Sequence, residues 1–305
     1  MPHQGMALCL GACLVIAGCA ADAEDVGSPA PLVVQDVIYG HKLGMALTLD
    51  VHSAADPNGA GILLMNSGGW LSPRCQFLAD EGEPLRLLTD AELDEAQPLC
   101  RELKPEYMAS RGFTVFDVRH GSSPRFNVAE AAADVRRALE YVYRHASDYG
   151  VDPSRLGVWG GSAGGQLALM LGLSDAEEAS STGNADASVA AIVAYFPPHD
   201  LEALVAYSPQ STTRLPAIAI AADELRAVSP VHHASADDPP TLIIHGDEDE
   251  LVPHAWGEAM HQALQAVGVE SKFITLEGAP HGFTGAYADS ALAASLAWFE
   301  AHLTR

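Results

Sequence analysis

Short apolar runs recur along the chain, and stretches with helical periodicity separate the later ones. Runs of this length, bounded by glycine, proline or polar residues, are typical of strands buried in a sheet. The expected strands are Leu32–Tyr39, Met45–Val51, Ile62–Met65, Phe113–Val118, Leu156–Trp159, Val189–Tyr195, Thr241–Ile244 and Lys272–Leu276. A Gly-His-Lys turn at residues 40–42 is expected to join the first two strands.

Helical periodicity is clearest after Asn127. Asn127 and Glu130 have the spacing of a capping box, and the apolar residues that follow fall on one face of a helix predicted over Val128–Tyr149. Further helices are expected at Gln166–Leu173, His254–Ala266 and Ser290–His302. Strands that alternate with helices predict an α/β fold with a mostly parallel sheet, covered by helices on both faces. Ligands then bind at the carboxyl ends of the strands.

Two segments depart from this alternation. Leu71–Lys104 is long and acidic, and we interpret it as an inserted loop with a helix near Asp90–Leu103. Pro197–Pro230 lies where a cap over the site is usual, but it is short and rich in alanine. Residues 32–305 are therefore predicted to form one domain with a minimal cap.

The first residues are expected to be a targeting signal. Met6–Gly18 is apolar but too short to span a bilayer, which predicts a signal peptide over residues 1–19. It ends in Ile16-Ala17-Gly18-Cys19, which resembles a bacterial lipobox in which Cys19 is lipidated and anchors the protein to a membrane. Plain secretion with cleavage nearby is the alternative. The polar residues 20–31 form a flexible tether, and we expect an exported protein, periplasmic or on the outer surface.

Export changes the interpretation of the remaining cysteines. Cys75 and Cys100 are an even pair in an oxidising compartment, which favours a disulfide across the inserted loop. Two buried free thiols are the alternative. Neither residue has a histidine or cysteine at ligand spacing, so no metal site is expected there.

The charge balance excludes one class of partner. The chain has 40 acidic and 16 basic side chains, which gives a formal net charge of −24. A negative field of this size repels phosphate backbones, so nucleic-acid binding is not expected.

The motif with the most chemical content is Gly160-Gly161-Ser162-Ala163-Gly164, between the expected strand Leu156–Trp159 and the expected helix Gln166–Leu173. Small residues around a serine allow a tight strand-to-helix turn that lifts the hydroxyl into a cleft. A plain glycine turn or a dinucleotide phosphate loop is the alternative, but the order GxGxxG is absent. Ser162 is therefore the candidate nucleophile.

A serine nucleophile needs a base. His281 lies in a glycine-flanked loop after the strand Lys272–Leu276, at the same sheet edge as Ser162. The other downstream histidines fit worse, and His245, at a strand end, is interpreted as a packing or turn residue. His281 is therefore the candidate base.

The base needs an orienting carboxylate, which is expected on the loop after Thr241–Ile244. Asp247 and Asp249 both lie on this loop. A carboxylate there accepts the Nδ1–H of His281 and fixes the tautomer that proton transfer requires. Position alone leaves both aspartates open.

Backbone N–H groups are expected to stabilise the oxyanion that forms during the reaction. Ala163 supplies one because it follows the nucleophile. Others are expected from the loop after Ile62–Met65, which reads Asn66-Ser67-Gly68-Gly69-Trp70. Consecutive glycines let N–H groups point into the site without a side-chain clash, and a plain glycine turn is the alternative.

Together these motifs resemble the α/β-hydrolase superfamily, nearest the acetyl-xylan/feruloyl esterase-like or carboxylesterase-like branch that carries GGSAGG at the nucleophile. The likeness extends from Val33 to the C-terminus. The family's HGxxDxxVP pattern matches residues 245–253 and implies Asp249 as the catalytic acid, and its PHGF-type ending matches His281. The family needs no metal or organic cofactor, so the resemblance implies none here.

The oxyanion loop departs from the family pattern. The family's HGGGW corresponds to residues 66–70, which implies Gly68 and Gly69 as donors. Asn66 and Ser67 stand in place of the family's histidine and first glycine.

The resemblance implies a serine esterase with the triad Ser162, Asp249 and His281, which hydrolyses short-acyl or polysaccharide-linked esters through an acyl-enzyme. One alternative is a serine peptidase of the prolyl-oligopeptidase type, although no strand-rich domain precedes residue 32. Another is a binding lipoprotein on the same fold without catalysis. That protein would retain all three residue types in the right order for no chemical reason.

Overall fold

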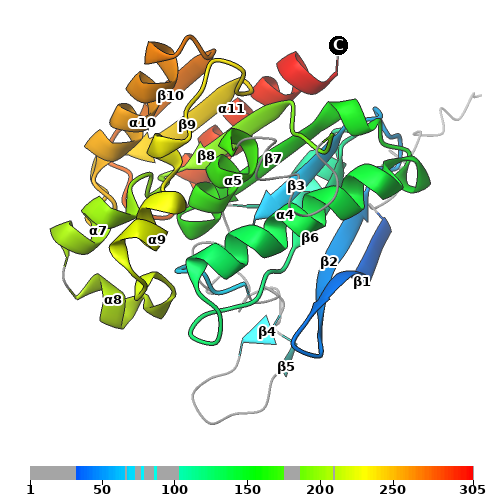
Figure 1. Ribbon diagram of the computed structural model, residues 1–305. Coiled ribbons are helices and arrows are strands. Elements are labelled where there is room, and N and C mark those ends of the chain that lie inside the picture. The colour runs from blue at the N-terminus through cyan, green and yellow to red at the C-terminus, as the bar shows by residue number, and fades with distance from the viewer. Residues whose placement is uncertain are drawn as a thin grey trace, which may run out of the picture.

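A computed structural model gives the fold (Figure 1). It describes residues 32–65, 67–72, 77–78, 86–87, 103–174, 186–208 and 210–304. The centre is an eight-stranded sheet in the order β1 (Leu32–Lys42), β2 (Met45–Ser53), β6 (Thr114–Val118), β3 (Gly61–Met65), β7 (Leu156–Gly161), β8 (Ala191–Tyr195), β9 (Thr241–Gly246) and β10 (Ser271–Leu276).

The sheet is mostly parallel, as the alternation of strands and helices predicts. β2 pairs antiparallel with β1 and β6, whereas β6, β3, β7, β8, β9 and β10 run parallel to one another. The carboxyl ends of the parallel strands therefore share one edge, where the loops after β3, β7, β9 and β10 meet.

The expected turn at residues 40–42 is wrong. β1 continues to Lys42, which pairs with Met45, and the turn is Leu43-Gly44 with φ of 48° and 81°. Two-residue turns with positive φ match the right-handed twist of a hairpin, so pairing continues to the tip.

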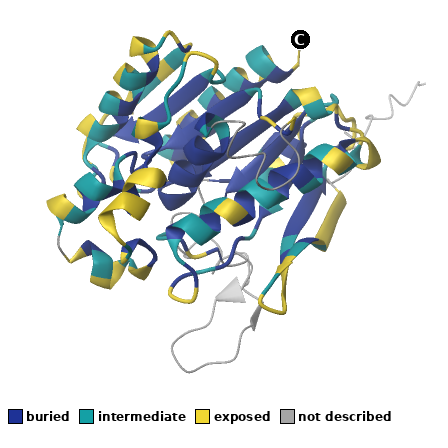
Figure 2. Cartoon of the chain, in the orientation of Figure 1, coloured by how far each residue is buried: buried dark blue, intermediate teal, exposed yellow. Residues whose placement is uncertain are grey.

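Helices cover both faces of the sheet (Figure 1). On one face the buried core joins α4 (Val128–His145), α5 (Ala163–Leu173) and α10 (His254–Ala266), and on the other it joins α3 (Pro105–Ala109) and α11 (Ala286–Leu303). Every residue of β3, β7 and β8 is buried, which agrees with their unbroken apolar sequences (Figure 2). The capping box of Asn127 and Glu130 begins α4, which ends at His145 in a 3₁₀ turn, Ala146–Tyr149.

The segment after β8 forms the short cap. Three small helices gather at one corner of the molecule (Figure 1), namely α7 (Leu201–Tyr207), α8 (Ser211–Arg214) and α9 (Ala222–Ala227), with 3₁₀ turns at Pro216–Ile218 and Pro230–His232. The inserted loop at residues 71–104 contains two short strands of two residues each, β4 (Phe77–Leu78) and β5 (Arg86–Leu87), which pair antiparallel with each other.

Several expectations from the sequence fall on residues outside this description. These are the signal peptide and tether, Cys19, the pair Cys75 and Cys100, and the helix near Asp90–Leu103 apart from Leu103 itself. Within the described part of the chain, no helix is both long and apolar enough to cross a membrane.

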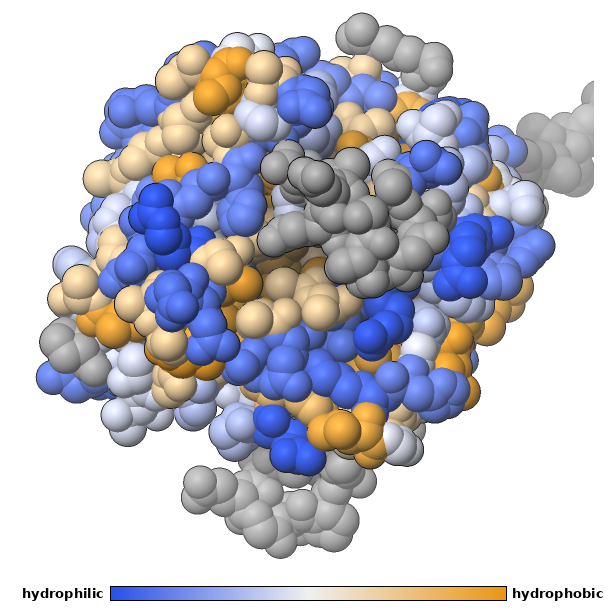
Figure 3. Space-filling model, viewed as in Figure 1, coloured by the Kyte–Doolittle hydropathy of each residue, from blue (hydrophilic) through white to orange (hydrophobic). Residues whose placement is uncertain are grey.

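The hairpin of β1 and β2 carries exposed apolar side chains. Leu32, Ile38 and Leu43 are among the most exposed large hydrophobic residues. Apolar side chains are visible on the side of the molecule where β1 and β2 lie (Figure 3). This edge of the sheet lies across the molecule from the strands that carry the candidate catalytic acid and base.

Candidate active site

The candidate nucleophile lies in a strained turn between β7 and α5. Ser162 has φ 53° and ψ −122°, a conformation that residues with a side chain rarely adopt, and its N–H donates to the carbonyl of Tyr195 at 2.9 Å. A non-glycine residue held there costs about 1–3 kcal/mol, which the surrounding structure must offset. The turn is the strand-to-helix elbow that the glycine-rich motif predicts.

Glycines around the elbow permit very close backbone contacts. A Cβ atom on Gly164 would lie 2.0 Å from the carbonyl oxygen of Met65, at the end of β3. One on Gly160 would lie 2.3 Å from the carbonyl oxygen of Gly164. Because real Cβ atoms do not approach so closely, a side chain at either position would push α5 away from the sheet.

His281 connects the nucleophile to a carboxylate. Its Nε2 lies 2.9 Å from Ser162 Oγ, and its Nδ1 lies 2.8 Å from Asp249 Oδ2. An ionised carboxylate only accepts hydrogen bonds, so Nδ1 carries the proton and Nε2 is left to accept the serine proton. The loop after β10 brings the imidazole to the elbow, where the ring packs on Phe196 with 4.5 Å between centroids.

Asp247 and Asp249, the two candidates for the acid, have different surroundings. The Asp249 side chain is fully buried, and its Oδ1 accepts the N–H groups of Leu251 and Val252, both at 2.8 Å. Asp247 instead accepts the N–H of Gly278 at 2.6 Å, which joins the β9 loop to the loop that carries His281. The structure therefore places Asp249 in hydrogen-bond contact with the His281 imidazole, whereas Asp247 joins the two loops through the backbone of Gly278.

The pKa of Asp249 lies well below its usual range. Burial acts in the opposite direction and would raise it, but hydrogen bonds from His245 and His281, the charge of His281 and the N–H of Val252 outweigh burial. Asp249 is therefore ionised at neutral pH, as an orienting acid would have to be.

His245 has a larger role than the sequence indicates. Its buried Nε2 lies 3.2 Å from Asp249 Oδ2 and 3.0 Å from the carbonyl of Val252. Both neighbours are acceptors, so Nε2 carries a proton that they share. Asp249 Oδ2 thus receives an imidazole N–H from each side, and His245 is not merely a packing residue. The signal that could have found it is the HGxxD spacing itself.

The turn after β3 differs from the expected oxyanion loop. Gly68 and Leu71 exchange backbone hydrogen bonds, with the Gly68 N–H donating to Leu71 at 3.1 Å, and the residues between them, Gly69 and Trp70, have φ of 57° and 60°. The expectation that Gly68 offers a free donor is therefore not met. Gly69 and Ala163 line the same cavity as Ser162, whereas Asn66 lies outside the described residues.

Trp70 fixes this turn to the nucleophile helix. Its indole N–H donates to Gln166 Oε1 at 2.9 Å, and Gln166 Nε2 donates to the carbonyl of Val228 at 2.7 Å. Gln166 is fully buried and both ends of its amide are satisfied. The sequence indicated only an apolar helix at this position, so this tie was missed.

Two cavities open at the triad. One, of about 320 Å³, contains Ser162 and is walled mainly by apolar residues of the cap and of the β9 loop, among them Leu204, Leu215 and Val252. The other, of about 800 Å³, is more open and has acidic walls that include Asp247 and Glu248 beside His281. Arg214, Glu250 and Leu251 line both cavities.

One group of metal-ligand types occurs among the described residues, and none of its members belongs to the triad. Asp200, Glu202 and His232 bring three ligand atoms within 4.8 Å of one another. Asp200 already accepts the N–H of Ala203 as the cap of α7, and the guanidinium of Arg226 lies 3.6 Å from Glu202. The carboxylates therefore have partners without a metal.

A strand-to-helix serine elbow, a histidine and an acid on later loops of a mostly parallel sheet define an α/β-hydrolase. The family model BD-FAE matches residues 95–264, more than half of the chain. The protein therefore belongs to the BD-FAE family and is an esterase-like α/β-hydrolase.

Curated relatives and solved structures agree with this placement. Esterase LipQ of Mycobacterium tuberculosis is 29% identical over 58% of this chain and 44% of its own length. The probable carboxylic ester hydrolase LipM of the same organism is 34% identical over 52% of this chain and 38% of its own. The match thus spans less than half the length of these relatives.

A solved structure matches most of the chain. Esterase 2 of Thermogutta terrifontis is 25% identical with a TM-score of 0.65, over 90% of this chain and 93% of that one. Its propionate-bound form matches with a TM-score of 0.63 at 25% identity, over 88% and 92% of the two chains.

The different contacts of the two aspartates give a prediction. Asp249→Asn should lower kcat about 10⁴-fold, because an amide in place of the carboxylate favours the wrong histidine tautomer. Asp247→Asn should lower it less than about tenfold, since the amide oxygen still accepts the Gly278 N–H. Steady-state kinetics on p-nitrophenyl acetate measure both. A larger loss in Asp247→Asn than in Asp249→Asn would contradict the assignment.

His199 gives a pH prediction for stability. Burial lowers its pKa from 6.5 to about 4, which the charge of Asp200 opposes and the nearby His232 and His245 reinforce. Below pH 6.5 the imidazole becomes protonated in the unfolded chain but stays neutral in the folded chain until the pH approaches 4. His199 therefore does not lower the free energy of unfolding above pH 6.5, and it lowers it by at most about 3 kcal/mol as the pH falls to 4.

Removal of the imidazole should flatten that dependence. We expect the free energy of unfolding of His199→Gln to change less between pH 6.5 and 4 than that of the wild type, as measured by urea denaturation. His41→Gln, which removes an exposed imidazole, is the matched control for the substitution itself. Equal slopes for His199→Gln and the wild type would refute the prediction.

Proposed function

We propose that this protein is a serine carboxylic ester hydrolase. The observation that carries the proposal is the continuous hydrogen-bonded path from Ser162 Oγ through His281 to Asp249, with distances of 2.9 and 2.8 Å, at the wall of a cavity. Hydroxyl, imidazole and buried carboxylate in this order are the parts of a nucleophilic triad.

The reaction proceeds in two halves. Ser162 attacks the ester carbonyl carbon while His281 Nε2 takes the hydroxyl proton, and the tetrahedral intermediate collapses when His281 returns this proton to the leaving alcohol. Water then attacks the acyl-enzyme while His281 takes its proton, and the bond from the acyl carbon to Ser162 Oγ breaks as His281 returns this proton to Ser162 and the acid is released. Asp249 supports the imidazolium in both halves.

The negative charge of the intermediate needs donors. Ala163 is the first residue of α5, so its N–H has no partner within the helix, and Gly69 borders the same cavity. We assign the oxyanion hole to these two N–H groups. The N–H of Gly68 donates to the carbonyl of Leu71 instead, and this hydrogen bond closes the turn that contains Gly69.

The cavities favour esters with a small acyl part. The enclosed one, of about 320 Å³, lies at the lower end of the range for ligand pockets, and its lining is mostly apolar. A structure of the Thermogutta terrifontis esterase contains propionate, a short acid. The larger, open and polar cavity beside His281 suits a hydrophilic alcohol part such as a sugar.

The nucleophile assignment is tested by a matched pair of serine variants. Ser162→Ala should abolish hydrolysis of p-nitrophenyl acetate and covalent labelling by a fluorophosphonate probe, because both need the hydroxyl. Ser290→Ala, which removes an exposed hydroxyl of α11, should change neither. Equal rates for wild type and Ser162→Ala would overturn the esterase proposal.

The size of the enclosed cavity gives the second test. We expect kcat/KM on p-nitrophenyl esters to be highest for acyl chains of two to four carbons and to fall at least about tenfold for a decanoyl chain, as the short-acyl proposal requires. Cleavage of the matching p-nitroanilides should be far slower. A preference for decanoyl esters would contradict the short-acyl proposal, and faster anilide cleavage would indicate a peptidase.

A further inference from the structure

A buried hydrogen bond anchors the start of the oxyanion turn. Ser67 is fully buried, and its Oγ lies 2.8 Å from His120 Nε2. His120 follows β6 and is itself buried, with 5% of its surface exposed. The two residues are far apart in the sequence and belong to loops at the ends of neighbouring strands.

The direction of this hydrogen bond follows from the other side of the imidazole. His120 Nδ1 lies 2.9 Å from the carbonyl of Gly121, which only accepts, so Nδ1 carries the proton. Burial lowers the pKa of His120, an effect that the Gly121 carbonyl and Asp134 oppose and Lys42 reinforces, so the ring is neutral. Nε2 therefore accepts a proton from the Ser67 hydroxyl.

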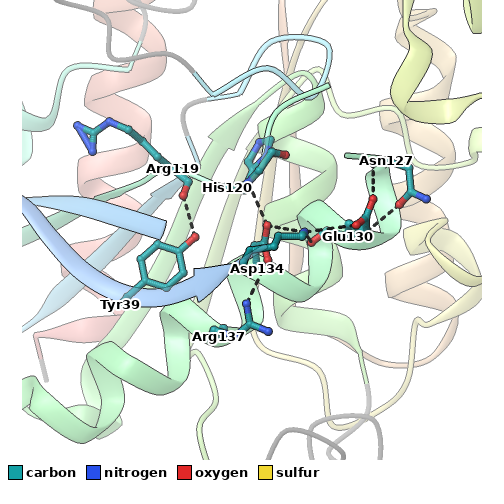
Figure 4. A network of polar contacts seen from close by, with 9 residues as sticks. Tyr39, Arg119, His120, Asn127, Glu130, Asp134 and Arg137 are labelled. Atoms are coloured by element: carbon teal, nitrogen blue, oxygen red, sulfur yellow. Dashed lines mark hydrogen bonds and ion pairs between the residues drawn. The ribbon is translucent and has the colours of Figure 1, made fainter. Parts of the chain in front are cut away.

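A charged cluster fixes the backbone next to His120, on the side away from Ser67. The N–H of Gly121 donates to Asp134 Oδ2 at 3.0 Å, and this buried carboxylate is paired with Lys42 at 2.9 Å and with Arg137 at 3.3 Å (Figure 4). His120 thus lies between a fixed ion-paired cluster of α4 and β1 residues and the oxyanion turn. Its ring has little freedom to move.

Ser67 also contacts α5, the helix that follows the nucleophile, through its backbone. The carbonyl of Ser67 accepts the N–H of Gly164 at 3.0 Å, two residues after the nucleophile. Farther along the turn, Ser123 N–H donates to the carbonyl of Trp70 at 3.0 Å. The loop after β6 therefore holds the oxyanion turn at both ends, once through a side-chain pair and once through the backbone.

We propose that Ser67 and His120 are a positioning pair, in which the neutral imidazole accepts the serine hydroxyl and so fixes the turn that presents the Gly69 N–H beside Ala163. This inference rests on the proposed esterase function. The pair occupies the part of the loop where Ser67 replaces a glycine of the family pattern.

The alternative is that the pair only fills space in the core. The two roles differ in their effect on kinetics. A donor misplaced by a fraction of an ångström stabilises the transition state less well while ground-state binding is unchanged, so kcat falls and KM does not. A packing defect lowers thermal stability without changing kcat at temperatures where the protein is folded.

The test uses Ser67→Ala, His120→Leu, their double variant and His120→Gln in the full chain. We expect kcat for p-nitrophenyl acetate to fall about ten- to hundredfold in Ser67→Ala and in His120→Leu, with KM within about twofold and the rate of fluorophosphonate labelling reduced in parallel. The double variant should lose no more than either single one, because the residues act as one unit. His120→Gln keeps an acceptor at the ε position and should recover most of the activity.

Thr114→Val is the matched control. Thr114 is buried at the start of β6, the strand that His120 follows, and its Oγ1 has no hydrogen-bond partner in the part of the chain that the structure describes. Its kcat should equal that of the wild type. Should His120→Leu not fold, Ser67→Ala and His120→Gln still decide the matter.

The outcomes separate the pair from the esterase function itself. A wild-type kcat in Ser67→Ala, with only the melting temperature lowered, would overturn the positioning role while the proposed function stands. Additive losses in the double variant would overturn it as well. A wild type that neither hydrolyses esters nor labels with the probe would overturn the proposed function and the role of the pair together.

Discussion

The backbone of Gly164 lies against the carbonyl of Met65 with no room for a side chain, and the geometry of the site depends on this contact. It brings the start of α5 to the end of β3, so that the elbow and the oxyanion turn become neighbours. The positive φ of Ser162 follows from the same constraint, because the chain must reverse within one residue to enter the helix. Strain at the nucleophile is therefore maintained by packing that buries the strands on both sides.

Much of the architecture could be predicted from the order of apolar and polar residues. Each expected strand is present within a few residues, because buried parallel strands need unbroken apolar runs and their ends need breakers. The β1–β2 turn was misplaced because Leu43 adopts a positive φ that the glycine at residue 44 alone did not reveal. Ser162 and His281 could be found because each stands in a loop after a strand with small neighbours, a local signal.

Other parts of the site depend on contacts that no local pattern contains. Asp247 and Asp249 lie on one loop, and only the folded chain decides which carboxylate is buried and which faces a backbone N–H. The loss of Gly68 as a donor results from a hydrogen bond within its own turn. Gln166 and His120 act through partners on distant segments, so their neighbours in the sequence carry no sign of the role.

Asp249 Oδ2 accepts hydrogen bonds from both His245 and His281, and this affects how well the carboxylate holds its position when the His281 ring moves. In the proposed mechanism His281 passes its proton between the nucleophile, the leaving group and water, and its ring must reorient slightly at each step. An acid held by that ring alone would be exposed to rearrangement whenever the ring turned. Because His245 donates to the same oxygen from the interior, the carboxylate keeps one hydrogen-bond partner when the His281 ring turns, and the proposed acid stays aligned for the next substrate.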